Sequence, residues 1–154
     1  MPCEKCRAEP GFHSFVKFGT KGEETLFYTS PAKTKDFRND GSKLTNVLQD
    51  IAESTDGKPW GWVLDCRNMD IRHYTDFSFN LGILQMLVDC PLNRTLWVLH
   101  PNLWIRTTIA LLRQFSYSTI FERVEYLEGS NLELMDRLEK AGLEPSAIRW
   151  LLGQ

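Results

Sequence analysis

A short apolar run followed by a half-apolar helical pattern, together residues 94–115, constrains the fold more than any other stretch. The run at 96–99, Leu-Trp-Val-Leu, consists of strand-forming residues and has the length of a buried strand. His100-Pro101-Asn102 ends it, because proline cannot donate a ladder hydrogen bond and asparagine is a good helix cap. A buried strand that leads into a helix through a tight polar turn is half of a β-α-β unit.

The helical pattern after Asn102 has a broad apolar face on one side and a basic stripe on the other. The apolar face holds Trp104, Ile105, Thr108, Ile109, Leu111, Leu112 and Phe115. Arg106, Ala110 and Arg113 follow the spacing i, i+4, i+7 on the other side.

The remaining segments repeat this alternation of strands and helices. We expect a β-hairpin from 12–18 and 25–29 around turn residues at 19–22, strands at 60–64 and 123–127, and helices at 42–51, 76–89, 130–142 and after Pro145. A brief helix or an ordered loop suits 116–122. Because helices join the last three strands, the core of the sheet should be parallel.

The helix after Gly129 has clear ends in the sequence. Ser130 and Glu133 fit a capping box, and Gly142 suits the position after the last helical turn. This helix should turn Leu134, Met135 and Leu138 inward. In total we predict a flexible tail at 1–10 and one α/β domain at 11–154, with a mixed, largely parallel sheet of about five strands flanked by helices.

Composition narrows the classes of function. The formal net charge of −2 gives no electrostatic case for nucleic-acid binding. The N-terminus lacks the apolar core of a signal peptide, and no apolar run approaches the length of a membrane span. We therefore expect a cytoplasmic protein with reduced thiols. Cys3 and Cys6 have the spacing that opens a zinc or redox site, but no second pair follows, so we interpret them as exposed thiols.

The sharpest catalytic motif is Cys66, five residues, and Arg72 directly after a strand. This is the spacing of protein tyrosine phosphatases, in which a loop of amides and an arginine hold phosphate against a thiolate. The loop has no glycine, however, and Asp65 and Asp70 would disfavour both a thiolate and a phosphate. We therefore rank a Cys66-dependent phosphatase or rhodanese-like enzyme third, behind the two non-enzymatic functions given below. For Cys66 itself, a small buried cysteine at a strand end is the preferred interpretation.

Other catalytic motifs are missing from the sequence. His13, His73 and His100 are scattered, and only His100 stands where ligands of α/β proteins tend to bind, at the end of a parallel strand. There is no Gly-rich phosphate loop, nucleophile elbow or zinc-protease motif. We therefore predict a protein that is not an enzyme and has neither a cofactor nor a metal site.

Large apolar side chains are concentrated instead between positions 104 and 121. The segment 115–121 is short and half polar, which makes it a plausible movable cover over an apolar cavity. The residues expected to line or gate this cavity are Trp104, Leu111, Leu112, Phe115, Tyr117, Ile120 and Phe121. Arg106 and Arg113 could meet anionic headgroups or an acidic partner.

Residues 96–115 (Leu-Trp-Val-Leu-His-Pro-Asn-Leu-Trp-Ile-Arg-Thr-Thr-Ile-Ala-Leu-Leu-Arg-Gln-Phe), then 120–127 and Leu132-Glu133-Leu134, resemble the CRAL-TRIO lipid-binding domain. The resemblance covers about 11–151 and is most specific over 94–134. It is closest to the divergent branch with the BCH domains of Rho-regulating scaffolds and the C-terminal domains of some macrodomain proteins.

The resemblance implies a mixed sheet and a hydrophobic pocket closed by a gate helix, here at about 104–121. It also implies a non-enzymatic module that binds a hydrophobic small molecule or phospholipid, with peripheral membrane contact. The alternative is a BCH-like protein-interaction scaffold with a filled cleft, whose partner is a small GTPase or a second copy. The sequence shows no N-terminal helical bundle of the kind usual in lipid-transfer members, which favours the scaffold.

Overall fold

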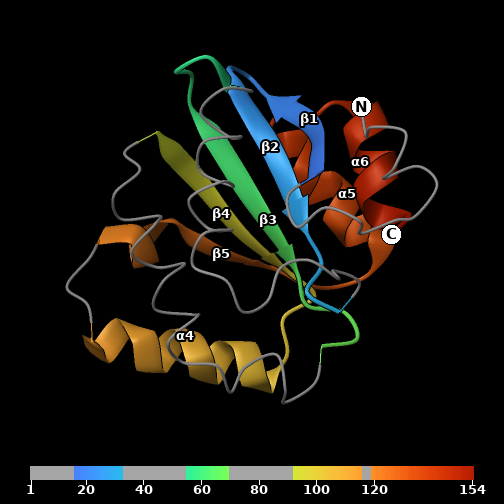
Figure 1. The fold of residues 1–154 in the computed structure, drawn as a ribbon. Coiled ribbons are helices and arrows are strands. Elements are labelled where there is room, and N and C mark those ends of the chain that lie inside the picture. Colours follow the sequence, from blue (N-terminus) through green and yellow to red (C-terminus); the bar gives the residue numbers. More distant parts are fainter. Residues whose placement is uncertain (1–15, 33–54, 70–91, 116–118) are drawn as a thin grey trace.

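The computed structural model describes residues 16–32, 55–69, 92–115 and 119–154. Its centre is a sheet in which strand order follows chain order, β1-β2-β3-β4-β5 (Figure 1). The strands are β1 (Val16–Lys21), β2 (Glu24–Thr29), β3 (Trp60–Asp65), β4 (Asn93–Leu99) and β5 (Val124–Leu127). β1 and β2 are antiparallel, whereas the pairs from β2 to β5 are parallel. The prediction of a mixed, largely parallel five-stranded sheet is confirmed.

Described helices lie on both faces of this sheet (Figure 1). α5 (Asn131–Lys140) and α6 (Pro145–Leu152) cover one face, and α4 (Leu103–Phe115) packs on the other. The short 3-10 helix η2 (Thr119–Arg123) leads into β5, so a brief helix is confirmed there. The tail at 1–10 and the helices expected at 42–51 and 76–89 lie outside the described residues.

The α5–α6 face carries a large apolar cluster of described residues. Alternate residues of the strands point to this face, because successive side chains of a strand alternate between the two sides. Leu134, Leu138, Ile148 and Leu151 fill the space above them from the helices. The strand members of this cluster are Val16, Phe18, Leu26, Tyr28, Val63, Trp97, Leu99 and Leu127.

The hairpin is confirmed, but its turn is shorter than expected. β1 continues through Gly19 to Lys21 with a bulge after Lys17, and only Gly22 and Glu23 separate the strands. Gly22 adopts φ +60, a conformation that glycine tolerates without strain. Gly19 belongs to the strand because Ala147 of α6 packs onto it, and a Cβ at Gly19 would lie 2.5 Å from the Ala147 Cβ.

The ends of α5 follow the expected capping pattern. The Glu133 amide donates to Ser130 Oγ at 3.2 Å, and Gly142 adopts φ +93 just past the helix. Leu134 and Leu138 are buried as predicted. The inward orientation predicted for Met135 is wrong: its side chain is exposed, because the contact stripe of this short helix is narrower than its apolar sequence pattern.

Candidate functional site

The site centres on α4, which starts immediately after the carboxyl end of β4. His100 turns the chain with φ +51, and its amide still bonds the Leu127 carbonyl of β5 at 2.9 Å. Asn102 then caps the helix as predicted, its Oδ1 accepting a hydrogen bond from the Ile105 amide at 3.1 Å. The helix is thus fixed at its first turn to the carboxyl edge of the sheet.

The side of α4 that faces the sheet is narrow. Ile105 is buried in a cluster with Cys66 and Val98, and Ile109 packs against the same cluster. Leu112, also buried, lies on the same side of the helix, seven residues after Ile105. Leu64, Met69, Val124 and Tyr126 complete the cluster from the strands and the loop after β3. The sheet-facing side of α4 is therefore in contact with side chains of the sheet and of the loop after β3.

A basic flank of α4 reaches back to β5 and η2. The Arg106 guanidinium lies 4.4 Å from the ring centroid of Tyr126 and pairs with Glu128 at 2.7 Å. Seven residues later, two turns along the same side of the helix, the Arg113 guanidinium lies 5.4 Å from the ring centroid of Phe121. Burial raises the pKa of Tyr126, and the charges of Arg106 and Arg113 oppose that rise. Both arginines thus face the β5 side of the sheet.

An apolar flank lies on the other side of the helix. Trp104 is 46% exposed and Leu111 is 44% exposed, so neither shares the burial of Ile105 on the side that faces the sheet. Both are about 200° around the helix axis from Arg106 and Arg113, respectively. Because the arginines point toward β5, Trp104 and Leu111 face away from β5.

The sheet surface in that direction is aromatic. Phe27 and Trp60 meet edge to face with ring centroids 6.0 Å apart, and Trp62 donates a hydrogen bond to Thr29 Oγ1 at 2.8 Å. These residues alternate along β2 and β3 in register with Leu64, which packs under α4, so they share its face of the sheet. The face of the sheet on the α4 side is therefore rich in large aromatic side chains, and Phe27, Trp60 and Trp62 are buried whereas Trp104 and Leu111 are exposed.

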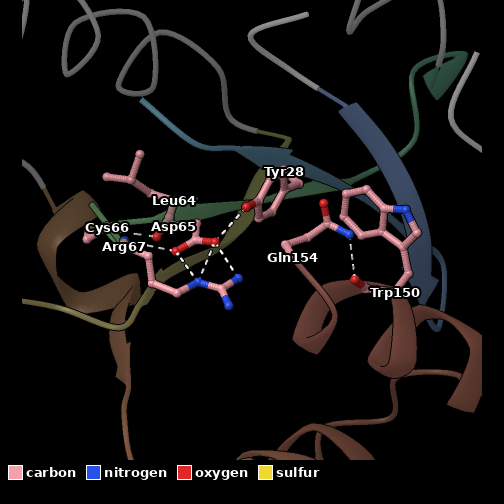
Figure 2. A network of polar contacts seen from close by, with 7 residues as sticks. All are labelled: Tyr28, Leu64, Asp65, Cys66, Arg67, Trp150 and Gln154. Atoms are coloured by element: carbon pink, nitrogen blue, oxygen red, sulfur yellow. Dashed lines mark hydrogen bonds and ion pairs between the residues drawn. The ribbon is translucent and has the colours of Figure 1, made fainter. Parts of the chain in front are cut away.

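On the opposite face, a buried polar cluster joins the carboxyl ends of β2 and β3 (Figure 2). Asp65, only 1% exposed, accepts a hydrogen bond from the Tyr28 hydroxyl at 2.5 Å and pairs with Arg67 at 2.7 Å. Burial alone would raise the pKa of Asp65, but the hydrogen bonds from Arg67 and Tyr28 outweigh it and lower this pKa. Burial and the Asp65 carboxylate together raise the pKa of Tyr28 far above its ordinary value.

His100 lies near this cluster at the end of β4. Burial first, and then the Arg67 guanidinium, lower the pKa of His100 below its ordinary value, while Asp65 acts in the opposite direction. Its imidazole is therefore neutral at pH 7. The cluster holds one carboxylate and one guanidinium that neutralise each other, which is the arrangement of a structural ion pair.

Cys66 belongs to the α4 side of the sheet. Its thiol is 2% exposed and packs with Val98 and Ile105. This is the environment of a packed cysteine at a strand end. Arg72, the other member of the phosphatase-like spacing, lies outside the described residues, so that chemistry stays a prediction.

The other predicted site residues divide into two groups. Phe121 is half-buried and contacts Arg113, which places it beside α4 as expected. Tyr117 and the side chains of Phe115 and Ile120 lie outside the described residues, as do Cys3 and Cys6. The contacts of Arg106 with Glu128 and Tyr126 could not be read from helical periodicity, because both partners follow the helix in a separate strand and loop.

Within the described ranges, no group of three or more His, Cys, Asp or Glu side chains could hold a metal ion. In the same part of the chain, no helix has both the length and the apolar character that a membrane span requires. Comparison with models of known protein families and with curated proteins gives no match.

Proposed function

We propose that this chain is a non-enzymatic binding module of the CRAL-TRIO kind, whose ligand is a hydrophobic small molecule or a phospholipid acyl chain. The ligand contacts the apolar flank of α4, Trp104 and Leu111, beside the aromatic face of β2 and β3. The observation that carries this proposal is that α4 is apolar on two sides, of which the sheet covers only one.

The apolar flank of α4 is a candidate binding surface. Large apolar side chains that lie together on one exposed helical stripe are typical of surfaces that bind a ligand or a partner. Leu103, 75% exposed at the start of α4, extends the apolar surface beyond the stripe. An acyl chain or other apolar ligand would remove this surface from water at about 25 cal/mol per Å².

The direct test is native mass spectrometry of freshly purified protein, followed by organic extraction and lipid identification. We expect a co-purifying lipid, or its uptake from phosphatidylcholine vesicles. A mass without ligand, combined with no uptake from vesicles, would contradict the proposal.

Leu111→Glu tests the flank itself with a fluorescent fatty acid, cis-parinaric acid, as the probe. Losing one apolar contact and adding a charge should weaken binding by roughly tenfold or more, because burying a leucine contributes about 1.5–3 kcal/mol. Leu132→Glu is the matched control, since Leu132 is 78% exposed on α5, across the sheet from α4. Equal weakening by both variants would count against α4 as the binding element.

A second candidate is a protein-interaction scaffold of the BCH kind. It is favoured by the packing of Ile105 and Ile109 against the cluster of Cys66 and Val98, which is what a cleft filled by the protein's own side chains requires. In that case the partner, a small GTPase or a second copy of the chain, would cover Trp104 and Leu111. Light scattering that shows a dimer free of lipid, and a monomer for Leu111→Glu, would support the scaffold over the lipid-binding module.

A further inference from the structure

The roll of α4 about its own axis is not determined by hydrophobic burial. A roll of about 100° would bring Trp104 and Leu111 onto the sheet in place of Ile105, Ile109 and Leu112, and the larger side chain of the tryptophan would offset much of the apolar area lost. The sequence pattern alone places the centre of the apolar face between these two orientations. The junction with β4 and the Asn102 cap restrain the first turn of α4. The orientation of the rest of the helix needs a further cause.

The contacts of the basic flank provide that cause. Arg106 stacks on Tyr126 and pairs with Glu128, and Arg113 stacks on Phe121. All these partners belong to β5, η2 or the residue just after β5. If α4 rolled onto its Trp104 side, both arginines would swing into solvent and lose all three contacts. A planar guanidinium over an aromatic ring is also sensitive to orientation, unlike contact between aliphatic side chains.

We propose that Arg106 and Arg113 are positioning residues, which fix the roll of α4 and thereby keep Trp104 and Leu111 exposed toward the ligand. The inference rests on the proposed function for its purpose, but the roll itself can be tested without any ligand. In this proposal the two arginines do not contact a lipid headgroup. They affect ligand binding only by holding the helix in its observed orientation.

The experiment measures the exposure of Trp104 by 19F NMR in protein labelled with 5-fluorotryptophan. The chain has five tryptophans, and Trp104→Phe assigns the resonance. In Arg106→Gln/Arg113→Gln we expect the relaxation caused by a soluble gadolinium chelate to fall at Trp104, toward the value of the buried Trp62. Loss of helical structure would instead raise it, so this direction separates a roll from unfolding of α4. An unchanged or increased exposure of Trp104 would overturn the proposal.

Two further variants control for loss of charge and for unfolding. Arg94→Gln/Arg149→Gln removes the same charge from two exposed arginines on β4 and α6, and should leave Trp104 unchanged. Glu128→Gln removes only one exposed contact and cannot unfold the chain; it should lower the exposure of Trp104 in the same direction by a smaller amount. A Trp104 response as large in the control pair as in the Arg106/Arg113 pair would also overturn the proposal.

Binding of cis-parinaric acid links the roll to function. The Arg106/Arg113 double variant should bind this probe several-fold more weakly than the wild type, and the Arg94/Arg149 control should not. If the wild type binds no probe, the proposed function fails while the NMR result still decides the roll. If Trp104 becomes buried but binding is unchanged, the role of these arginines in ligand binding is rejected.

Discussion

Asp65 shows how a carboxylate remains charged inside this core. Its two oxygens accept hydrogen bonds from the Arg67 side chain, the Arg67 amide and the Tyr28 hydroxyl. The Tyr28 ring is in turn held edge to face by Trp150 of α6, with centroids 5.1 Å apart (Figure 2). A single side chain thus connects β2, β3 and the loop after β3 beneath α6.

Asp65→Asn should lower the free energy of unfolding by about 3 kcal/mol, because it leaves Arg67 without its charged partner beside the core. Urea denaturation at pH 7 measures this loss. Asp136→Asn is the control: its ion pair with Lys140 is solvent-exposed on α5, so the change should be below about 1 kcal/mol. Equal losses in the two variants would show that the buried pair contributes no more than a surface pair.

The same pair predicts a dependence of stability on pH. The pKa of Asp65 is lower in the folded protein than its ordinary value of 3.8, so the folded state holds this proton less tightly than the unfolded state. The contribution to stability is therefore complete above that ordinary value and is lost as the pH falls through the folded pKa. The difference in unfolding free energy between wild type and Asp65→Asn should shrink below pH 3.8, and a constant difference would contradict this account.

At the scale of the elements, the contact between β1 and α6 depends on the absence of a side chain at Gly19. A methyl group there would lie 2.5 Å from the Ala147 Cβ, so Gly19→Ala should cost about 1–3 kcal/mol. Ala147→Gly alone should cost about 1 kcal/mol through helix propensity. In a double-mutant cycle by urea denaturation, the double variant should be more stable than the sum of the single losses predicts. Additive losses would mean that the two residues do not press on each other.

The elements differ in how far local sequence could predict them. Alternation and turn residues were enough for the hairpin and for β3, β4 and β5, and caps were enough for the start of α4 and both ends of α5. The length of β1 was missed, because Gly19 reads as a turn residue unless Ala147 is known to lie above it. The orientation of α4 about its own axis could not be predicted from its own sequence either. Its arginines contact Tyr126 and Phe121, which belong to other elements.

The candidate site was predictable to the same extent. Composition and spacing singled out α4 and placed Trp104 and Leu111 among the residues that line an apolar cavity. They could not show that these two side chains are exposed while Ile105 is buried. The Tyr28–Asp65–Arg67 cluster had no signal in the sequence except an acidic residue and an arginine at a strand end. Its third member, Tyr28, comes from a strand that only the sheet register brings alongside Asp65.

At the scale of the whole molecule, α6 joins the first hairpin to the last helices. Leu151 is fully buried in the cluster that contains Phe18 and Leu26, and Trp150 stacks on Phe18 with centroids 5.3 Å apart. Leu151→Ala should therefore cost about 2–5 kcal/mol. Hydrogen exchange should show reduced protection in β1 as well as in α6, whereas Leu132→Ala on the exposed side of α5 should leave both unchanged. Reduced protection confined to α6 would contradict a shared core.

Because strand order equals chain order, this sheet can be built in the sequence in which a ribosome delivers it. Each new strand is laid beside the one made before it, and no existing pair has to open to admit a later strand. The hairpin of β1 and β2 is the earliest described part of the sheet to be made, and α6, which packs on its inner face, follows the last described strand. The packing of α6 on Phe18, Leu26 and Tyr28 therefore waits until the described strands are complete, and this is the interval in which a chaperone would be of most use.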